Sequence, residues 1–202
     1  GDFESHKRVI DTLRSASRAT GRRVAVMADL SGPKMRIGKL KEEPVELKVD
    51  DVFTLTTKEI VGDVTRASVS FSRLVKAVKP GDALFLNDGF IQLEVARVQG
   101  EEVQCKVVVG GELRSRKGLN LPGIDLGISA FTEWDRECLR FAMEQGVDAV
   151  SQSFVESGKD IDAVRQAAKE LGHNPFILAK IERSRALDRF QEILDSADGI
   201  MI

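Results

Sequence analysis

The alternation of apolar and polar positions changes twice along the chain. Residues 3–20 carry apolar side chains at helical spacing and end before a glycine, which predicts a helix. Its apolar face would consist of Ile10, Leu13 and Ala16. The next apolar run, residues 24–28, is short and continuous and leads into turn-forming residues, which favours a strand buried on both faces of a parallel sheet. The start of the chain is therefore predicted to be α/β.

Residues 39–121 have a different pattern, in which short strands alternate with turns and no helix exceeds about two turns. Apolar and charged side chains alternate over residues 45–49, so one face of that strand should meet a core and the other solvent. Glycine-bearing turns at residues 87–89 and 110–111 predict hairpins. We expect a small all-β module, either a barrel or a sandwich. Its predicted strands are residues 45–49, 52–57, 83–86, 90–98 and 103–109.

The α/β pattern returns after this module and continues to the last residue. Thr132 with Asp135, and Ser157 with Asp160, have the spacing of capping boxes, so each pair should begin a helix. A third helix is expected over residues 186–197. The side chains expected to be buried are Cys138, Phe141 and Ala142 in the first helix, Ile161, Val164 and Ala168 in the second, and Leu187, Phe190 and Leu194 in the third. The predicted strands are residues 147–155, 176–182 and 199–202.

The β module thus interrupts a repeating α/β unit. We assign residues 1–38 and 122–202 to the α/β domain and residues 39–121 to the inserted module. The predicted fold class is α/β, a partial (β/α)8 TIM barrel with an inserted small all-β barrel domain. Since such a barrel typically takes roughly 250 residues, more than twice the α/β part present, we expect the sequence to be a fragment.

Composition excludes several classes of protein. The chain has 30 Lys and Arg against 32 Asp and Glu, a formal net charge of −2, which excludes a generic electrostatic binder of nucleic acid or membranes. The apolar content of 42% is sufficient for a packed core, and no apolar run is long enough for a membrane span or a secretory signal. Cys105 and Cys138 are most simply free thiols in a reducing cytoplasm, and a disulfide is the alternative.

Several common catalytic signatures are missing. The sequence has no G-x-x-x-x-G-K-[ST], H-E-x-x-H, C-x-x-C or G-x-S-x-G motif. P-loop transfer, zinc-dependent hydrolysis and Ser-His-Asp chemistry are therefore disfavoured.

The pair Lys180 and Glu182 is the first candidate for chemistry. The two residues are two positions apart at the end of a predicted strand, so their side chains point the same way. Active sites of parallel barrels lie at the carboxyl ends of the strands. The pair is either an ion pair at the rim, or a carboxylate ligand for a divalent cation beside an ammonium directed at a transferring anion.

Two basic segments are further candidates. Residues 29–38 contain Gly32, Pro33 and Gly38 and suit a turn that leads from a strand into the next domain. That interpretation leaves Arg36 unexplained, and its planar guanidinium could bind phosphate. Residues 114–123 are either a basic linker leaving the β module or a phosphate contact.

Six segments are informative when taken together: residues 29–38, Asn87-Asp88-Gly89, residues 117–123, Ser153-Phe154-Val155, Lys180-Ile181-Glu182 and residues 198–201. Together these segments resemble pyruvate kinase. They occur in the order of that family, and the resemblance extends over essentially the whole chain. It implies a catalytic barrel with a β-rich lid inserted between the third strand and the third helix. It also implies transfer of phosphate from phosphoenolpyruvate to ADP, giving pyruvate and ATP in glycolysis.

The resemblance also implies roles for individual residues. Lys180 would act at the transferring phosphoryl group, and Glu182 would bind Mg²⁺ or Mn²⁺. Asp29 would help to hold K⁺, together with the main-chain carbonyl of Leu30, where many members of the family carry threonine. Arg36 and Lys117 would contact the nucleotide, ADP or ATP.

The same resemblance leads to expectations about the parent enzyme, which should be cytoplasmic and a homotetramer. Several family site residues would lie before the first residue or after the last, so the 202-residue chain should be inactive alone. Two alternatives remain. One is a non-catalytic binding or regulatory protein that retains the lid and half-barrel. The other is a different barrel enzyme acting on phosphoenolpyruvate or a 2-oxo acid, which would have no reason to keep the β module.

Overall fold

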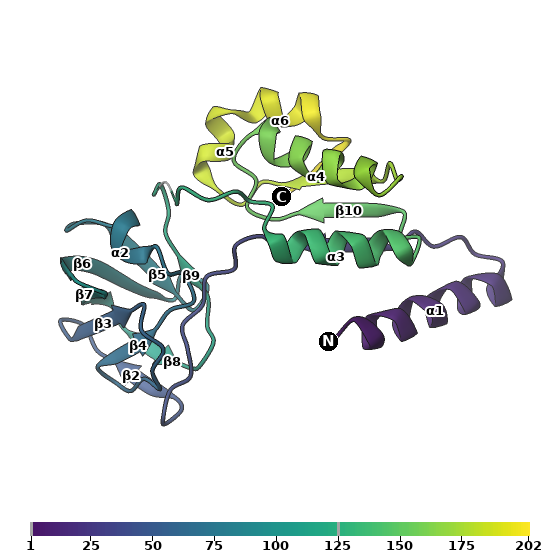
Figure 1. Cartoon of the computed structure of the whole chain (residues 1–202). Helices are drawn as coiled ribbons and strands as arrows, with labels where there is room; N and C mark the ends of the chain where they lie inside the picture. The colour runs from purple at the N-terminus through teal and green to yellow at the C-terminus, as the bar shows by residue number, and fades with distance from the viewer. Residues whose placement is uncertain (1, 125) are drawn as a thin grey trace. The chain divides into compact units, whose positions relative to one another are not determined.

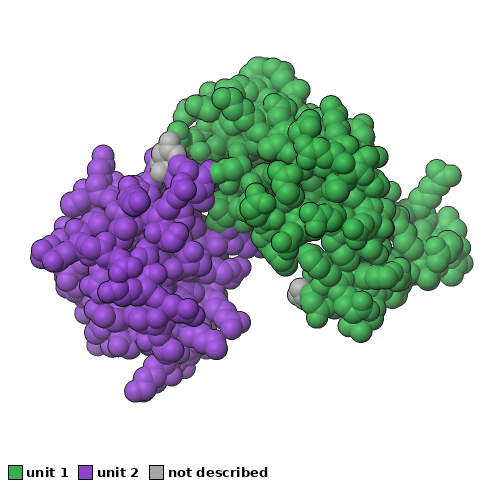
Figure 2. Space-filling view, viewed as in Figure 1, with its two compact units in different colours: residues 1–33, 129–202 green, residues 34–128 purple. Residues whose placement is uncertain are grey.

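The chain forms two compact units, which Figure 2 shows in different colours. The computed structural model describes residues 2–124 and 126–202. The first unit comprises residues 1–33 and 129–202, and the second comprises residues 34–128. Residues 34–38 and 122–128, which the sequence pattern had placed in the α/β part, group with the β unit because Met35, Ile37 and Leu126 are buried in its apolar core.

The first unit is built on a parallel sheet with the strand order β1-β10-β11-β12. Helices α3 and α4 run alongside strand β10 (Figure 1). The strands are β1 Met27–Leu30, β10 Ala149–Gln152, β11 Phe176–Lys180 and β12 Gly199–Met201. The helices are α1 Phe3–Thr20, α3 Glu133–Glu144, α4 Gly158–Glu170, α5 Ser184–Asp188 and α6 Phe190–Ser196.

One face of this sheet packs against the helices. Leu30, Val150 and Ile177 on that face are at most 1% exposed and belong to one apolar core with side chains of α3, α4 and α6. Side chains alternate along a strand, so the opposite face carries Met27, which is 44% exposed, and Phe176, which is 50% exposed. The expectation that the first strand is buried on both faces is therefore wrong, because among the described residues the helices cover only one face.

Short sequence motifs correctly predict where helices α1, α3 and α4 begin or end. The capping boxes of Thr132 with Asp135 and of Ser157 with Asp160 are both formed, and α1 ends at Gly21 as expected. The buried faces are less well predicted. In α3 the buried apolar residues are Leu139, Ala142 and Met143, whereas Phe141 stacks on Phe3 of α1 with ring centroids 4.7 Å apart. Helix α1 has no buried residue, so its expected apolar face is not part of the core.

The single helix expected over residues 186–197 is two short helices. They are separated at Arg189, whose φ of −121° and ψ of 24° are not helical. Because of this break, the two helices do not present one continuous apolar face, and Ala186 and Ile193 are the residues that become buried. The side chains expected to be buried are instead exposed: Leu187 by 66%, Phe190 by 37% and Leu194 by 42%.

An aspartate that precedes a strand ties neighbouring strands of this sheet together. Asp198, before β12, accepts the Ile177 N–H at 2.8 Å and the Arg165 guanidinium at 3.0 Å. Burial by itself would raise the pKa of Asp198, but these two donors stabilise the carboxylate and lower its pKa below the ordinary value. Asp148, before β10, has the same kind of arrangement.

The second unit contains a six-stranded sheet in the order β4-β3-β7-β6-β5-β9 and a two-stranded sheet of β2 and β8. Its helix, α2, has four residues, in line with the expected lack of long helices. The elements are β2 Val45–Leu47, β3 Val52–Thr56, β4 Arg66–Ser68, α2 Leu74–Ala77, β5 Ala83–Leu86, β6 Ile91–Gln99, β7 Glu102–Val109, β8 Gly111–Leu113 and β9 Leu119–Asn120.

One of the two predicted hairpins forms. The turn at residues 87–89 joins the antiparallel strands β5 and β6, with φ of 52° at Asn87 and 56° at Asp88. The hairpin predicted at residues 110–111 is wrong, because β8 pairs with β2 rather than with β7. At Gly110 the chain passes so close to the carbonyl oxygen of Leu47 that a Cβ atom would collide with it. This glycine therefore permits a close approach of two backbones.

Both cysteines are free thiols, as the simpler of the two interpretations predicted. Cys105 is buried in the core of the second unit, and this burial raises the pKa of its thiol to about 12. Within the described residues, no helix combines the length and the apolar character that crossing a membrane requires.

Candidate functional site at the carboxyl ends of the strands

Three of the predicted site residues lie together in the first unit. Asp29 is in β1, Lys180 is the last residue of β11, and Glu182 follows two residues later. The Lys180 ammonium is 3.4 Å from Asp29 Oδ1 and 3.1 Å from Glu182 Oε1. The two-residue spacing thus does place Lys180 and Glu182 side by side, and the parallel register adds Asp29 from a strand far away in the sequence.

Lys180 is the most enclosed of the three. Its side chain is 18% exposed, compared with 36% for Glu182 and 51% for Asp29. Burial opposes the charge on Lys180, but hydrogen bonding to Glu182 and the nearby charge of Asp29 outweigh it and raise the pKa of the ammonium. The site therefore holds a fixed positive charge between two carboxylates.

Ser151 of β10 and Ser153, just after that strand, complete this group, and the sequence pattern assigned neither residue a role. The Ser151 hydroxyl donates to Asp29 Oδ1 at 2.8 Å, and the Ser153 hydroxyl accepts the Lys180 ammonium at 2.9 Å. Ser151 is 0% exposed and Ser153 is 3% exposed. The signal that could have found them is their two-residue spacing at the end of a buried strand next to the strand of Asp29.

The backbone after β10 orients Glu182. The Phe154 N–H donates to Glu182 Oε2 at 3.0 Å, while Glu182 Oε1 faces Lys180. Phe154 has a φ of 61°, in the left-handed region that bulky residues rarely adopt. Both carboxylate oxygens of Glu182 are therefore held by partners in the structure.

The donor set suits hard cations only in part. Asp29 and Glu182 supply carboxylate oxygens, the ligands that Mg²⁺ takes together with substrate phosphates. Leu30 is 1% exposed, and its carbonyl accepts the Ser153 N–H at 3.0 Å, which leaves one lone pair for another partner. In residues 2–124 and 126–202, however, no group of three or more His, Cys, Asp and Glu is placed to hold a metal ion.

Arg36 and Lys117 belong to the second unit, whereas the residues around Lys180 belong to the first. Arg36 and Lys117 themselves lie on adjacent segments of the second unit. Arg36 forms a β-bridge with Gly118, and the Ile37 N–H donates to the Lys117 carbonyl at 3.0 Å. The exposed Arg36 guanidinium donates to the Arg116 carbonyl at 2.8 Å. The structure thus places the backbones of Arg36 and Lys117 on neighbouring segments of the second unit.

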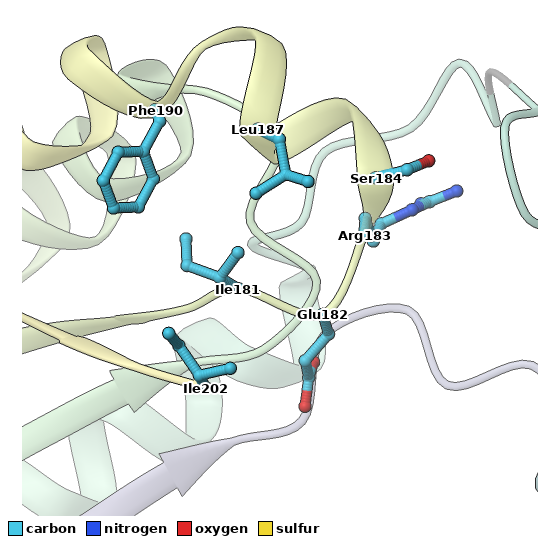
Figure 3. A pocket seen from close by; sticks show the side chains of 7 residues that line it. All are labelled: Ile181, Glu182, Arg183, Ser184, Leu187, Phe190 and Ile202. Atoms are coloured by element: carbon cyan, nitrogen blue, oxygen red, sulfur yellow. The ribbon is translucent and has the colours of Figure 1, made fainter.

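A pocket of about 460 Å³ lies beside Glu182. Figure 3 shows Leu187 and Phe190 facing Ile181 and Ile202, with Glu182 to one side of them. Of the three grouped residues, Glu182 alone lines this pocket, so the apolar hollow and the charged group around Lys180 are different features.

Comparison with known proteins agrees with the sequence resemblance. A family model described as "Pyruvate kinase, barrel domain" matches residues 1–202. A pyruvate kinase of Thermococcus litoralis is 46% identical over 202 residues, which are 100% of this chain and 42% of that protein. Pyruvate kinases of Thermotoga maritima and Corynebacterium efficiens are 38% and 35% identical over the same length, which is 43% of each. The chain spans less than half the length of these relatives, and it belongs to the pyruvate kinase family.

Proposed function

We propose that the protein to which this chain belongs is a pyruvate kinase, which transfers phosphate from phosphoenolpyruvate to ADP and gives pyruvate and ATP. The observation that carries the proposal is the Lys180 ammonium, fixed between Asp29 and Glu182 at the carboxyl ends of parallel strands. Family membership supports the reaction type, and the geometry supports the residues.

The chemistry of phosphoryl transfer matches what this group offers. The reaction requires positioning and neutralisation of negative charge more than covalent chemistry by the protein. Lys180 can donate to oxygens of the transferring phosphoryl group, and its contacts with Ser153 and Glu182 hold it ready before substrate arrives. A charge fixed in advance does not have to reorganise during the reaction.

The cations would use the same residues. Glu182 would bind Mg²⁺ or Mn²⁺, and Asp29 with the Leu30 carbonyl would bind K⁺. When bound, these ions would neutralise charge on the phosphates. Ser151 would keep Asp29 in one orientation, since its buried hydroxyl donates to Asp29 Oδ1.

The remaining assignments concern the second unit, the complete barrel and the oligomeric state of the parent enzyme. The second unit would be the lid, with Arg36 and Lys117 contacting ADP or ATP, and closure would exclude water from the reaction. The four parallel strands of the first unit would be part of a (β/α)8 barrel. The parent enzyme would be a cytoplasmic homotetramer. These assignments rest on family membership.

A graft tests the proposal. The aligned 202 residues of the Thermococcus litoralis relative would be replaced by this chain, with which they share 46% identity. Pyruvate formation would be followed with lactate dehydrogenase and NADH, with and without ADP. We expect ADP-dependent pyruvate formation that is lost in the Glu182→Gln graft. A folded graft that forms no pyruvate, while the unmodified relative does, would contradict the proposal and favour a non-catalytic binding protein.

A further inference from the structure

Two short segments carry the chain out of the first unit and back into it. We call them the crossing segments, residues 31–33 and 129–131. Each is held by a side chain that is 0% exposed. Asp135 accepts the Gly32 N–H at 3.0 Å, and the Gln152 amide donates to the Ala130 carbonyl at 2.8 Å. Buried polar side chains thus tie both crossing segments to the first unit.

Gln152 makes a second hydrogen bond that leads to the charged group. The same Nε2 atom donates to the Ser153 carbonyl at 3.0 Å. That carbonyl and the Phe154 N–H belong to one peptide unit, and the N–H donates to Glu182. The hydroxyl of Ser153 meanwhile accepts the Lys180 ammonium. One side chain therefore fixes the peptide that binds Glu182, and that peptide begins at the residue whose hydroxyl accepts the Lys180 ammonium.

The conformation of this peptide needs such support. Phe154 has a φ of 61°, which is unfavourable for a residue with a bulky side chain. Without a donor on the Ser153 carbonyl, rotation of the peptide would relieve the unfavourable φ and turn the Phe154 N–H away from Glu182. The hydrogen bond from Gln152 opposes this rotation at the carbonyl end of the peptide.

The unused oxygen of Gln152 argues against a role in stability alone. Among the described residues, Gln152 Oε1 is buried and has no hydrogen-bond partner. A buried acceptor without a partner is unfavourable, and methionine, of similar shape, would avoid it. What glutamine offers over methionine at this place is the pair of directed bonds from Nε2.

We propose that Gln152 is a positioning residue that holds the Ser153–Phe154 peptide in the orientation needed by Lys180 and Glu182, and anchors it to the returning crossing segment. The importance of that orientation for catalysis rests on the proposed function, whereas the orientation itself does not. The proposal can therefore be tested on the folded chain without an activity assay.

The test compares the chain with its Gln152→Met variant by NMR. Hydrogen exchange would be measured at the backbone amides of Ala130 and Phe154, and the ¹⁵N signal of the Lys180 ammonium would be recorded, with Lys180→Arg used for its assignment. We expect roughly tenfold faster exchange at both amides, because the bonds that fix their neighbourhood are lost. The Lys180 signal should shift, because its contact with Ser153 loosens.

Two control variants separate positioning from general destabilisation. Val164→Ala leaves a cavity in the core between α4 and the sheet, so it should speed exchange throughout that core. Gln166→Met removes an amide that bonds Glu170 on the exposed face of α4, so it should leave all three signals unchanged. Gln152→Met should act only around the crossing segment and the charged group.

The outcomes decide the question. Unchanged exchange at Phe154 and an unchanged Lys180 signal in folded Gln152→Met would overturn the proposal, as would a uniform effect like that of Val164→Ala. If Gln152→Met does not fold, the same measurements apply to Gln152→Asn, which keeps the amide but is one methylene too short. Failure of both variants to fold would show a general structural role and would also overturn the proposal. None of these results depends on whether the graft forms pyruvate.

Discussion

Replacement of Gly32 by alanine should strongly destabilise the first unit. Gly32 has a φ of 61°, and a Cβ atom there would lie 2.9 Å from the Ser153 carbonyl oxygen and 3.3 Å from that of Ala130. The left-handed conformation costs alanine about 1 kcal/mol relative to glycine. The third close neighbour is Cδ2 of Phe154, and the two carbonyl oxygens are backbone atoms that cannot move aside freely, so overpacking adds about 2 kcal/mol. We expect Gly32→Ala to lower the free energy of unfolding by about 3 kcal/mol.

Gly146 provides a matched control in the same unit. Its φ is 62°, and a Cβ atom there would have no neighbour within 4 Å. Gly146→Ala therefore has the conformational penalty alone, about 1 kcal/mol. The difference of about 2 kcal/mol between the two variants isolates the close approach at Gly32 from the effect of a positive φ.

Urea unfolding followed by tryptophan fluorescence measures this difference. The only tryptophan, Trp134, is in α3, so its signal reports on the first unit. The chain has two units, so the transitions should be compared by their midpoints and slopes. If Gly32→Ala and Gly146→Ala destabilise the unit equally, the backbone atoms do not approach Gly32 as closely as described, and the packing of the loop after Asp29 is wrong.

Three further predictions concern single side chains. Cys105, whose pKa is raised to about 12 by burial, should not react with Ellman's reagent at pH 8 in the folded protein and should react fully after unfolding. Asp198→Asn should lower stability at neutral pH by about 1 kcal/mol, discounted for exposure. Because the folded pKa of Asp198 is lowered, this contribution is present above the unfolded value near 3.9 and is lost as the pH falls through the lower, folded value. The wild type and the variant should therefore converge in urea titrations at acidic pH. Ser151→Ala should lower the free energy of unfolding by about 1 kcal/mol, and by much less when Asp29→Asn is already present, as a double-mutant cycle would show.

The predictable part of the fold is the part set by local interactions. The capping box of Thr132 depends on residues three positions apart, and the turn at residues 87–89 depends on residues that tolerate positive φ. The buried side of a helix depends instead on distant elements. Nothing local indicates that a break at Arg189 leaves Leu187 exposed, or that β8 pairs with β2 rather than with β7.

The candidate site, like the fold, can be predicted from the sequence only where local interactions determine it. The spacing of Lys180 and Glu182 in a strand is a local signal, and the structure places their side chains in contact. The contributions of Ser153 and Gln152 depend on the parallel register and on a positive φ at Phe154, which tertiary contacts impose. The spacing of the serines indicates a role only once the neighbouring strand is known, and glutamine at the end of a strand carries no local sign of one.

Substitution of Lys180 in the grafted enzyme tests the central claim most directly. Lys180→Met removes the ammonium but keeps a chain of similar length, and Lys169→Met on the exposed side of α4 is the matched control. The turnover number would be measured by the coupled assay, and folding by circular dichroism. We expect Lys180→Met to lower kcat by at least about 100-fold with little loss of structure, and Lys169→Met to leave kcat unchanged. A folded Lys180→Met graft that turns over at a rate close to that of the unsubstituted graft would contradict the account.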